Sequence, residues 1–205
     1  MEKINVYNLI VLDESGSMGV IRNSAISGCN ETIQSIRATQ DKYKDEQNHF
    51  LSLVSFNSDE SNKVIFDKVP IAEVREVAAT DYRPNACTPL YDAIGISASY
   101  LRDTMPKNVE CVAMVTVITD GYENASEKYD GSRLKSLVAE LESLGWKFSY
   151  IGANQDVIQE SRKIGISKSF SFLASEKGVR RAFDSAANYL EECAEVCACE
   201  RRARK

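Results

Sequence analysis

Histidine is almost absent from the sequence, which contains one histidine and one tryptophan among 205 residues. The single histidine, His49, precedes Asp120 in the chain, and this order does not match the serine, acid and histidine order of α/β-hydrolases. Serine also stands two residues before Ser17, where the nucleophile elbow of those enzymes requires glycine. Neither a Walker A sequence nor a G-x-G-x-x-G sequence is present, so no motif supports nucleotide binding. We therefore expect a protein that is not an enzyme.

Positive charge and long apolar runs are also scarce. Lysine and arginine number 25 against 30 acidic residues, so the formal net charge is −5 and no overall basic field attracts nucleic acid or an anionic membrane. The apolar run near the N-terminus, 7–12, is too short for a signal peptide or a membrane span. Six cysteines occur without a secretory signal, so we expect reduced thiols and a cytoplasmic location.

Short apolar runs alternate with segments that repeat apolar residues at helical spacing, which is typical of an α/β protein with a mostly parallel sheet. Strands are predicted at 7–12, 49–56, 63–69, 109–119, 146–152 and 169–173, and helices at 21–36, 71–77, 90–105, 134–144, 155–164 and 179–197. The connection 57–62 is too short for a crossover, so the third strand is predicted to be antiparallel. We predict a three-layer, Rossmann-like open sheet of about six strands, mostly parallel with one antiparallel edge strand, and helices on both faces.

The length of the chain predicts one domain. We place this domain at residues 1–192, and we expect residues 193–205 to form a basic, cysteine-containing tail that continues the last helix. Cys193 and Cys197 share a helix face, but with Cys199 they provide only three thiols, and no fourth zinc ligand lies nearby in the sequence. We therefore expect these cysteines to pack against the domain or to lie in the tail.

Oxygen-bearing side chains follow two of the predicted strands and occupy one loop between them. They are Asp13, Ser15 and Ser17 after the first strand, Thr88 in an irregular loop, and Asp120 after the strand at 109–119. In an open α/β sheet the ligand crevice lies beyond the carboxyl ends of the strands. Two carboxylates and three hydroxyls, without histidine or cysteine, suit a hard cation such as Mg²⁺ or Mn²⁺ better than zinc or copper. Taken alone, the Asp-x-Ser-x-Ser triplet also fits a plain helix N-cap.

The order of these motifs resembles the von Willebrand factor type A (vWA) domain, whose metal-ion-dependent adhesion site (MIDAS) is Asp-x-Ser-x-Ser with a distant threonine and aspartate. The matching segments are VLDESGSMG, NACTPLYDAI and VITDGYEN, and the resemblance runs from residue 6 to about residue 189. One departure is Cys87, because many relatives have glycine just before the threonine. The chain looks most similar to small, stand-alone bacterial members.

The resemblance implies one Mg²⁺ at the carboxyl edge of the sheet. It implies that Ser15 and Ser17 bind the ion directly, that Asp13, Thr88 and Asp120 bind it directly or through water, and that an aspartate or glutamate of a protein partner completes the shell. We therefore expect a metal-dependent protein–protein interaction module of unspecified oligomeric state.

The loops around the expected metal site offer further candidate partner contacts, since aromatic and arginine side chains are common interface anchors. These candidates are Glu14, Tyr82, Arg83, Tyr91, Tyr122, Glu123 and Asn124. Two alternatives remain open. One is a metal-dependent hydrolase or phosphatase with Glu14 or Glu123 as general base, although Ser15 stands where the haloacid-dehalogenase phosphatases need a second aspartate. The other is a scaffold whose metal is purely structural.

Overall fold

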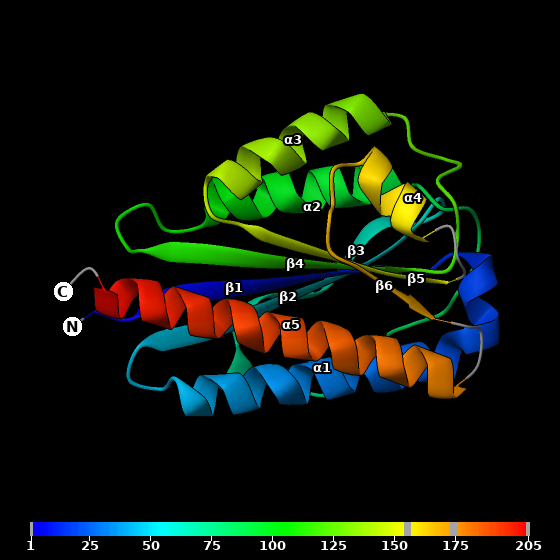
Figure 1. The fold of residues 1–205 in the computed structure, drawn as a ribbon. Helices are drawn as coiled ribbons and strands as arrows, with labels where there is room; N and C mark the ends of the chain where they lie inside the picture. The colour runs from blue at the N-terminus through cyan, green and yellow to red at the C-terminus, as the bar shows by residue number, and fades with distance from the viewer. Residues whose placement is uncertain (1, 154–156, 173–175, 204–205) are drawn as a thin grey trace.

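The computed structural model of the chain describes residues 2–153, 157–172 and 176–203. Its centre is a six-stranded sheet with the order β3-β2-β1-β4-β5-β6 (Figure 1). Of these six strands, β3 at one edge pairs antiparallel with its neighbour, and all other pairings are parallel. The strands are β1 (Ile4–Asp13), β2 (Gln47–Asn57), β3 (Ser61–Pro70), β4 (Cys111–Thr119), β5 (Lys147–Ala153) and β6 (Ser169–Phe172). The predicted sheet, including its antiparallel edge strand, is confirmed.

Helices cover both faces of the sheet, as predicted. Figure 1 shows α1 and α5 side by side on one face, with α2, α3 and α4 on the other. The helices are α1 (Arg22–Lys42), α2 (Leu90–Thr104), α3 (Gly131–Ser143), α4 (Val157–Lys163) and α5 (Glu176–Ala203), with short 3-10 helices η1 (Gly16–Ile21) and η2 (Ile71–Glu73). Within the described ranges, no helix is both long enough and apolar enough to cross a membrane.

The central strands are buried on both faces. In β1, Val6 and Ile10 pack into the core shared with α1 and α5, whereas Leu9 and Val11 pack into the core shared with α2 and α3. A strand that is covered on both sides needs a nearly continuous apolar run, and this is the pattern that β1 and β4 show. The two cores therefore fix the position of both strands, whose carboxyl ends lie at the same edge of the sheet.

The short helix expected at 71–77 is not formed. Only its first three residues make a helical turn, η2, and the rest is irregular. Side chains of α1 bond to the backbone of this segment. The Arg37 guanidinium donates to the Ile71 carbonyl at 3.2 Å, and the Asn30 amide exchanges two hydrogen bonds with the backbone of Val77, at 3.1 and 2.8 Å. These bonds satisfy polar groups that a helix would have satisfied internally.

The last helix runs without a break across the boundary that we placed at residue 192. α5 continues to Ala203, and Cys193 and Ala198 are buried in the core that α5 shares with α1. The Arg202 guanidinium pairs with the Glu46 carboxylate near the start of β2. The predicted start of α4 at 155 and the predicted end of the last strand at 173 lie outside the described residues.

A glycine lets α1 and α5 approach closely. A Cβ added at Gly28 of α1 would lie 2.4 Å from Cδ2 of the Phe183 ring in α5. The ring is almost completely buried, so its neighbours in the core restrict its movement. The contact between the two helices therefore depends on the absence of a side chain at this position.

We expect Gly28→Ala to lower the free energy of unfolding by up to about 2 kcal/mol. This is the usual overpacking cost of about 1–3 kcal/mol, less the gain of about 1 kcal/mol that alanine brings as the better helix former. Gly19→Ala is the matched control, because a Cβ at that position meets nothing within 4 Å. Urea unfolding measures the wild type and both variants. If Gly28→Ala were as stable as Gly19→Ala, the two helices would accommodate the extra methyl group without cost.

His49 lies buried within β2. Its Nε2 atom lies 2.9 Å from the Gln47 amide oxygen, and its Nδ1 atom lies 3.4 Å from the Asn8 amide nitrogen. Because an amide oxygen accepts and an amide nitrogen donates, these contacts fit a neutral ring that carries its proton on Nε2. Burial lowers the pKa of His49 to about 4. The ring is therefore a neutral structural group at neutral pH.

Protonation of His49 should oppose folding. The folded pKa of about 4 lies below the ordinary value of 6.5, so the unfolded chain binds more protons between these values and stability falls as the pH falls through this window. The difference corresponds to about 3 kcal/mol once both states are protonated. Urea unfolding from pH 7 to pH 4 should show a steeper loss for the wild type than for His49→Gln. If the free energy of unfolding fell equally with pH in the wild type and in His49→Gln, the low pKa assigned to His49 would be wrong.

Candidate functional site

Parallel pairing of β1 with β4 brings two carboxylates to one edge of the sheet. Asp13 is the last residue of β1, and Asp120 directly follows β4. Leu12 pairs with Ile118 in the register of the two strands. Two residues that lie more than a hundred positions apart in the sequence therefore meet where the central strands end.

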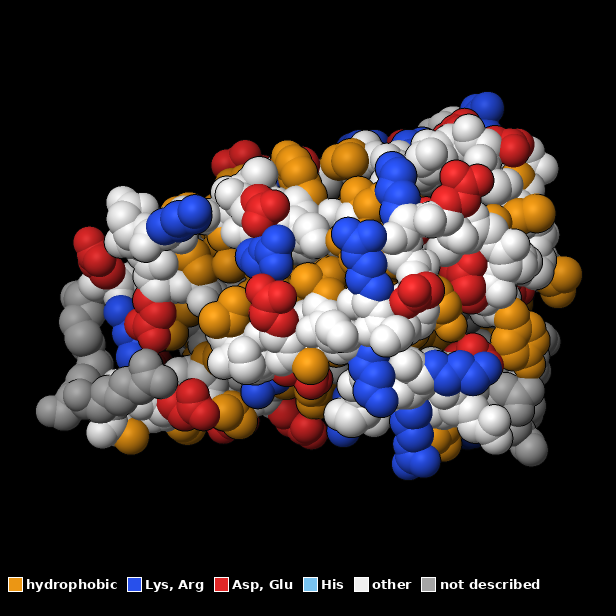
Figure 2. Space-filling view, turned by 90° about the horizontal axis from the view of Figure 1, so that it is seen from above, with side chains coloured by type: hydrophobic (Ala, Val, Ile, Leu, Met, Phe, Trp, Pro, Cys, Tyr) orange, Lys and Arg blue, Asp and Glu red, His pale blue; other side chains and the backbone are white. Residues whose placement is uncertain are grey.

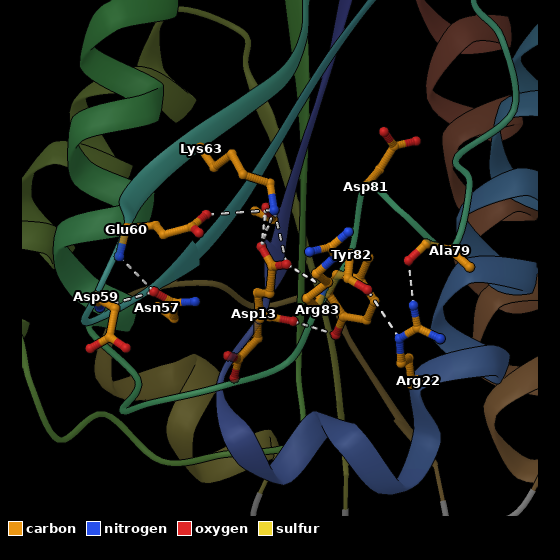
Figure 3. A network of polar contacts seen from close by, with 12 residues as sticks. Asp13, Arg22, Asn57, Asp59, Glu60, Lys63, Ala79, Asp81, Tyr82 and Arg83 are labelled. Carbon is orange, nitrogen blue, oxygen red and sulfur yellow. Dashed lines mark hydrogen bonds and ion pairs between the residues drawn. The ribbon is translucent and has the colours of Figure 1, made fainter.

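Asp13 is fully buried and its carboxyl group is held by hydrogen bonds. Oδ1 accepts the backbone N–H of Ser15 at 2.7 Å, and Oδ2 accepts the Thr119 hydroxyl at 2.6 Å. The main-chain carbonyl of Asp13 accepts the Tyr82 hydroxyl at 2.6 Å, a contact that is drawn in Figure 3. Both the side chain and the backbone at the end of β1 are therefore fixed by buried donors.

Ser15 and Ser17 connect this carboxylate to Asp120. The two Oγ atoms lie 3.2 Å apart, and the Ser17 hydroxyl donates to Asp120 Oδ1 at 2.6 Å. Ser15 is the N-cap residue of η1, but its side chain makes no capping hydrogen bond with the described residues of that helix. The plain N-cap interpretation of the triplet therefore does not explain where the hydroxyls lie.

Thr88 reaches the same place from the loop before α2. Its backbone N–H donates to the Asn124 amide oxygen at 2.8 Å, and the Asn124 N–H donates to the Thr88 carbonyl at 3.2 Å. A Cβ added at Gly121 would lie 3.2 Å from the Thr88 hydroxyl oxygen. The same atom would lie 3.5 Å from the Ser17 hydroxyl oxygen and 3.6 Å from Asp13 Oδ2. Oxygens from three segments therefore surround one point that glycine leaves open.

The two carboxylates have no basic partner among the described residues. Burial raises the pKa of Asp13 to about 6, and burial also raises the pKa of Asp120. No described lysine or arginine forms an ion pair with either group. A buried carboxylate without a positive partner is costly, and a bound cation would supply the missing charge. The described chain offers no cluster of three or more His, Cys, Asp or Glu side chains for a metal, so a divalent cation here would use the hydroxyls as well.

Two of the expected partner contacts are buried, and this corrects the expectation for them. Tyr82 is completely buried, and its hydroxyl is bonded to the Asp13 carbonyl. The Glu14 side chain is 2% exposed and forms an ion pair with Lys63. Residues in a loop beside a site can fold back under it, and both of these do. They support the site from within the domain and present no side chain to a partner.

The other five candidates lie in the loops around the site. Arg83, Tyr122 and Asn124 are exposed, and Tyr91 is partly buried. The Glu123 carboxylate accepts the backbone N–H of Tyr91 at 2.8 Å and two N–H groups of its own loop at 2.9 and 2.7 Å. Glu123 and Asn124 therefore also join the loop after β4 to the loop before α2.

Three further residues support the site, and none of them was predicted from the sequence. Thr119 bonds to Asp13, and Ser55 and Lys63 bond to Glu14. Thr119 and Ser55 are hydroxyl residues near the carboxyl ends of buried strands, and this position was an available signal. Lys63 gave no signal, because a lysine in an edge strand is ordinarily an exposed residue.

An open α/β sheet with carboxylates and hydroxyls at its carboxyl edge defines a Rossmann-like binding domain, and the family comparison agrees with this. The model of the von Willebrand factor type A domain matches residues 9–186. The chain therefore belongs to the von Willebrand factor type A family. Domains of this family generally mediate metal-dependent protein–protein interaction and are generally not enzymes. Among curated proteins, none matches the chain.

Solved structures with the same fold share little sequence with the chain. A von Willebrand factor type A protein from Catenulispora acidiphila is 18% identical with a TM-score of 0.61, over 90% of this chain and 42% of that one. Proximal thread matrix protein 1 from the mussel byssus, described with a zinc-occupied MIDAS motif, is 12% identical with a TM-score of 0.56, over 91% and 46%. BatB from Bacteroides thetaiotaomicron is 14% identical with a TM-score of 0.55, over 93% and 99%. The chain thus spans less than half the length of the first two proteins, and these likenesses show the fold alone.

We expect Tyr82→Phe to lower the free energy of unfolding by about 1–3 kcal/mol, because it leaves the buried Asp13 carbonyl without its hydroxyl donor. Tyr122→Phe is the matched control, since that side chain is 55% exposed and should lose little. Urea unfolding of the metal-free proteins compares the two variants. Equal stability of the two variants would show that the end of β1 does not need the Tyr82 hydroxyl as a donor.

Proposed function

We propose that this domain is a metal-dependent protein–protein interaction module in which Mg²⁺ or Mn²⁺ captures an aspartate or glutamate side chain of a partner. The observation that carries the proposal is the convergence of the Asp13, Ser17 and Thr88 oxygens around one open point beside Gly121. The absence of a basic partner for Asp13 and Asp120 among the described residues supports a cation at this point. Zinc in the MIDAS of the mussel byssus protein supports a divalent metal in this fold.

Five residues would hold the ion, namely Asp13, Ser15, Ser17, Thr88 and Asp120. Mg²⁺ prefers six oxygen ligands and keeps several waters readily. When bound, the ion would supply a positive charge and a coordination position that a carboxylate of another protein can occupy. Asp13 is fully buried, Asp120 is half-buried and Ser17 is exposed, so the group of ligands opens toward solvent on one side. This gradient of burial suits capture of a side chain from a second protein.

The hydrolase alternative is less well supported, because both acids that could serve as general base are engaged. The Glu14 carboxylate is buried and lies 3.0 Å from the Lys63 ammonium. The Glu123 carboxylate accepts three backbone N–H groups and the Ser126 hydroxyl. A general base needs a lone pair directed at the water that it activates. Both carboxylates instead act as acceptors that hold the loops.

The structural-metal alternative predicts an ion enclosed by the fold. Ser17 is exposed, and the side chain of Tyr122, two residues after Asp120, is 55% exposed. A cation held at this edge of the sheet would therefore be accessible to another molecule. This exposure favours an ion that takes part in binding over one that only stabilises the domain.

Mg²⁺ or Mn²⁺ should raise the thermal stability of the wild type, by about 2.7 kcal/mol at a metal concentration 100 times the Kd. Asp120→Ala should lose most of this shift, because it removes one of the two carboxylate ligands. Asp184→Ala, which removes an exposed acid from α5, is the matched control and should keep the shift. Thermal unfolding across a series of each metal, with EDTA and Ca²⁺ as further controls, measures all three proteins.

Other outcomes of the same comparison would change the proposal. No shift in the wild type at millimolar metal, together with no EDTA-sensitive partner capture, would reject the metal site. A shift that is lost in Asp120→Ala, while partner capture is unchanged, would indicate a structural metal. A phosphatase screen with Mg²⁺ completes the set, and turnover that disappears in Asp13→Ala would replace the binding module with a hydrolase.

A further inference from the structure

Glu14 directly follows Asp13 in the metal-site motif, yet its side chain bonds to distant segments of the chain. Lys63 Nζ lies 3.0 Å from each of the two carboxylate oxygens. The Ser55 hydroxyl donates to Oε2 at 2.5 Å, and the backbone N–H of Arg83 donates to Oε1. The side chain is 2% exposed, so these donors replace the water that the charge would otherwise bind. Both oxygens of this buried carboxylate are therefore satisfied within the protein.

The donors to Glu14 come from three different elements. Ser55 lies in β2, Lys63 lies in the edge strand β3, and Arg83 lies in the loop that leads to Thr88. Figure 3 shows Lys63 reaching from β3 toward the end of β1, with Arg83 on the other side of the contact. One carboxylate thus joins the end of β1 to the β2–β3 hairpin and to the loop 82–88.

Backbone hydrogen bonds join the loop 82–88 to the same part of the chain. The N–H of Asn85 donates to the Glu14 carbonyl at 2.8 Å, and the N–H of Gly16 donates to the Ala86 carbonyl at 3.0 Å. Ala86 has a φ of 63°, a left-handed conformation that alanine rarely adopts. Residues in such conformations persist where the surrounding structure holds them. The loop is therefore held in a demanding conformation by residues that flank the metal-site serines.

The tip of the β2–β3 hairpin holds the loop from the other side. The N–H of Ser58 donates to the Cys87 carbonyl at 3.1 Å, and the N–H of Cys87 donates to the Ser58 hydroxyl at 3.0 Å. The Asn85 amide donates to the Asp59 carboxylate at 3.1 Å. Lys63 lies near the same end of the hairpin, opposite Ser55, and pairs with Glu14. The end of the hairpin and Glu14 therefore both hold the segment just before Thr88.

We propose that Glu14 and Lys63 form a positioning pair for the metal site, which sets the place of the loop 82–88, and hence of the Thr88 hydroxyl, relative to the ligands that follow β1. The inference rests on the proposed metal function and assigns to it two residues that do not touch the ion. The negative charge of Glu14 matters because charge-assisted hydrogen bonds are stronger than neutral ones. Loss of the Glu14–Lys63 pair should therefore weaken metal binding more than it weakens the rest of the fold.

Glu14→Gln tests the inference, because it keeps the size of the side chain and one acceptor oxygen but removes the charge. Calorimetric titration of the metal-free full chain should show Mg²⁺ or Mn²⁺ binding about 10–100-fold weaker than in the wild type, as for other residues that orient metal ligands. Amide hydrogen exchange without metal should become faster in the loop 82–88. Ser55→Ala removes a single donor to Glu14, so it should change both measurements in the same direction by a smaller amount. This variant tests the inference if Glu14→Gln does not fold.

Glu46→Gln is the matched control, since it neutralises a carboxylate that pairs with Arg202 at the opposite end of the sheet. It should leave metal affinity and loop exchange unchanged. Equal metal affinity in the wild type and Glu14→Gln would overturn the inference and leave the proposed function intact. Equal weakening in Glu14→Gln and Glu46→Gln would also overturn it, because the effect would then be general destabilisation. A wild type that binds no metal would reject the proposed function and the inference together.

Discussion

The candidate site depends on the parallel register between β1 and β4. Leu12 pairs with Ile118, so Asp13 stands level with Thr119 and one residue before Asp120. A shift of one residue in either strand would turn its side chains to the opposite face of the sheet. Such a shift is strongly disfavoured, because both strands bury apolar side chains in the two cores that the helices cover. The cores thus determine how close the two carboxylates lie, although none of the five proposed metal ligands is an apolar core residue.

Holding two acids together has a physical consequence for the loops around them. Hydroxyl and N–H donors orient the carboxylates, but among the described residues they bring no compensating positive charge. Lys63, whose side chain reaches this motif, is paired with Glu14. The protein therefore separates two tasks between two consecutive residues. Asp13 remains uncompensated and available to a cation, whereas Glu14 is neutralised internally and used to hold the loops together.

Much of this arrangement could be predicted from the sequence, because its signals are local. Apolar runs mark the strands, and the polar residues that end the first and fourth strands mark the sheet edge where Asp13 and Asp120 lie. Tertiary hydrogen bonds defeat the same reasoning at 71–77, whose backbone bonds to side chains of α1 instead of forming a helix. The burial of Tyr82 and Glu14 could not be predicted either. Their partners lie tens of residues away, and position within a loop does not reveal which side chains fold inward.

The end of α5 has a practical consequence for work with the protein. The Arg201 guanidinium donates to the carbonyls of Glu2 and Glu46, so the last helix meets the first strand at the amino end of the sheet. Figure 1 shows the start of β1 and the end of α5 on the side opposite to the carboxyl edge of the sheet. Asp13 and Asp120 lie at that carboxyl edge, because they end β1 and follow β4. A fluorophore, an affinity tag or a sensor surface coupled to either end therefore stands a full sheet length from the proposed metal. An immobilised layer of the protein would present its binding edge outward, whichever end carries the linkage.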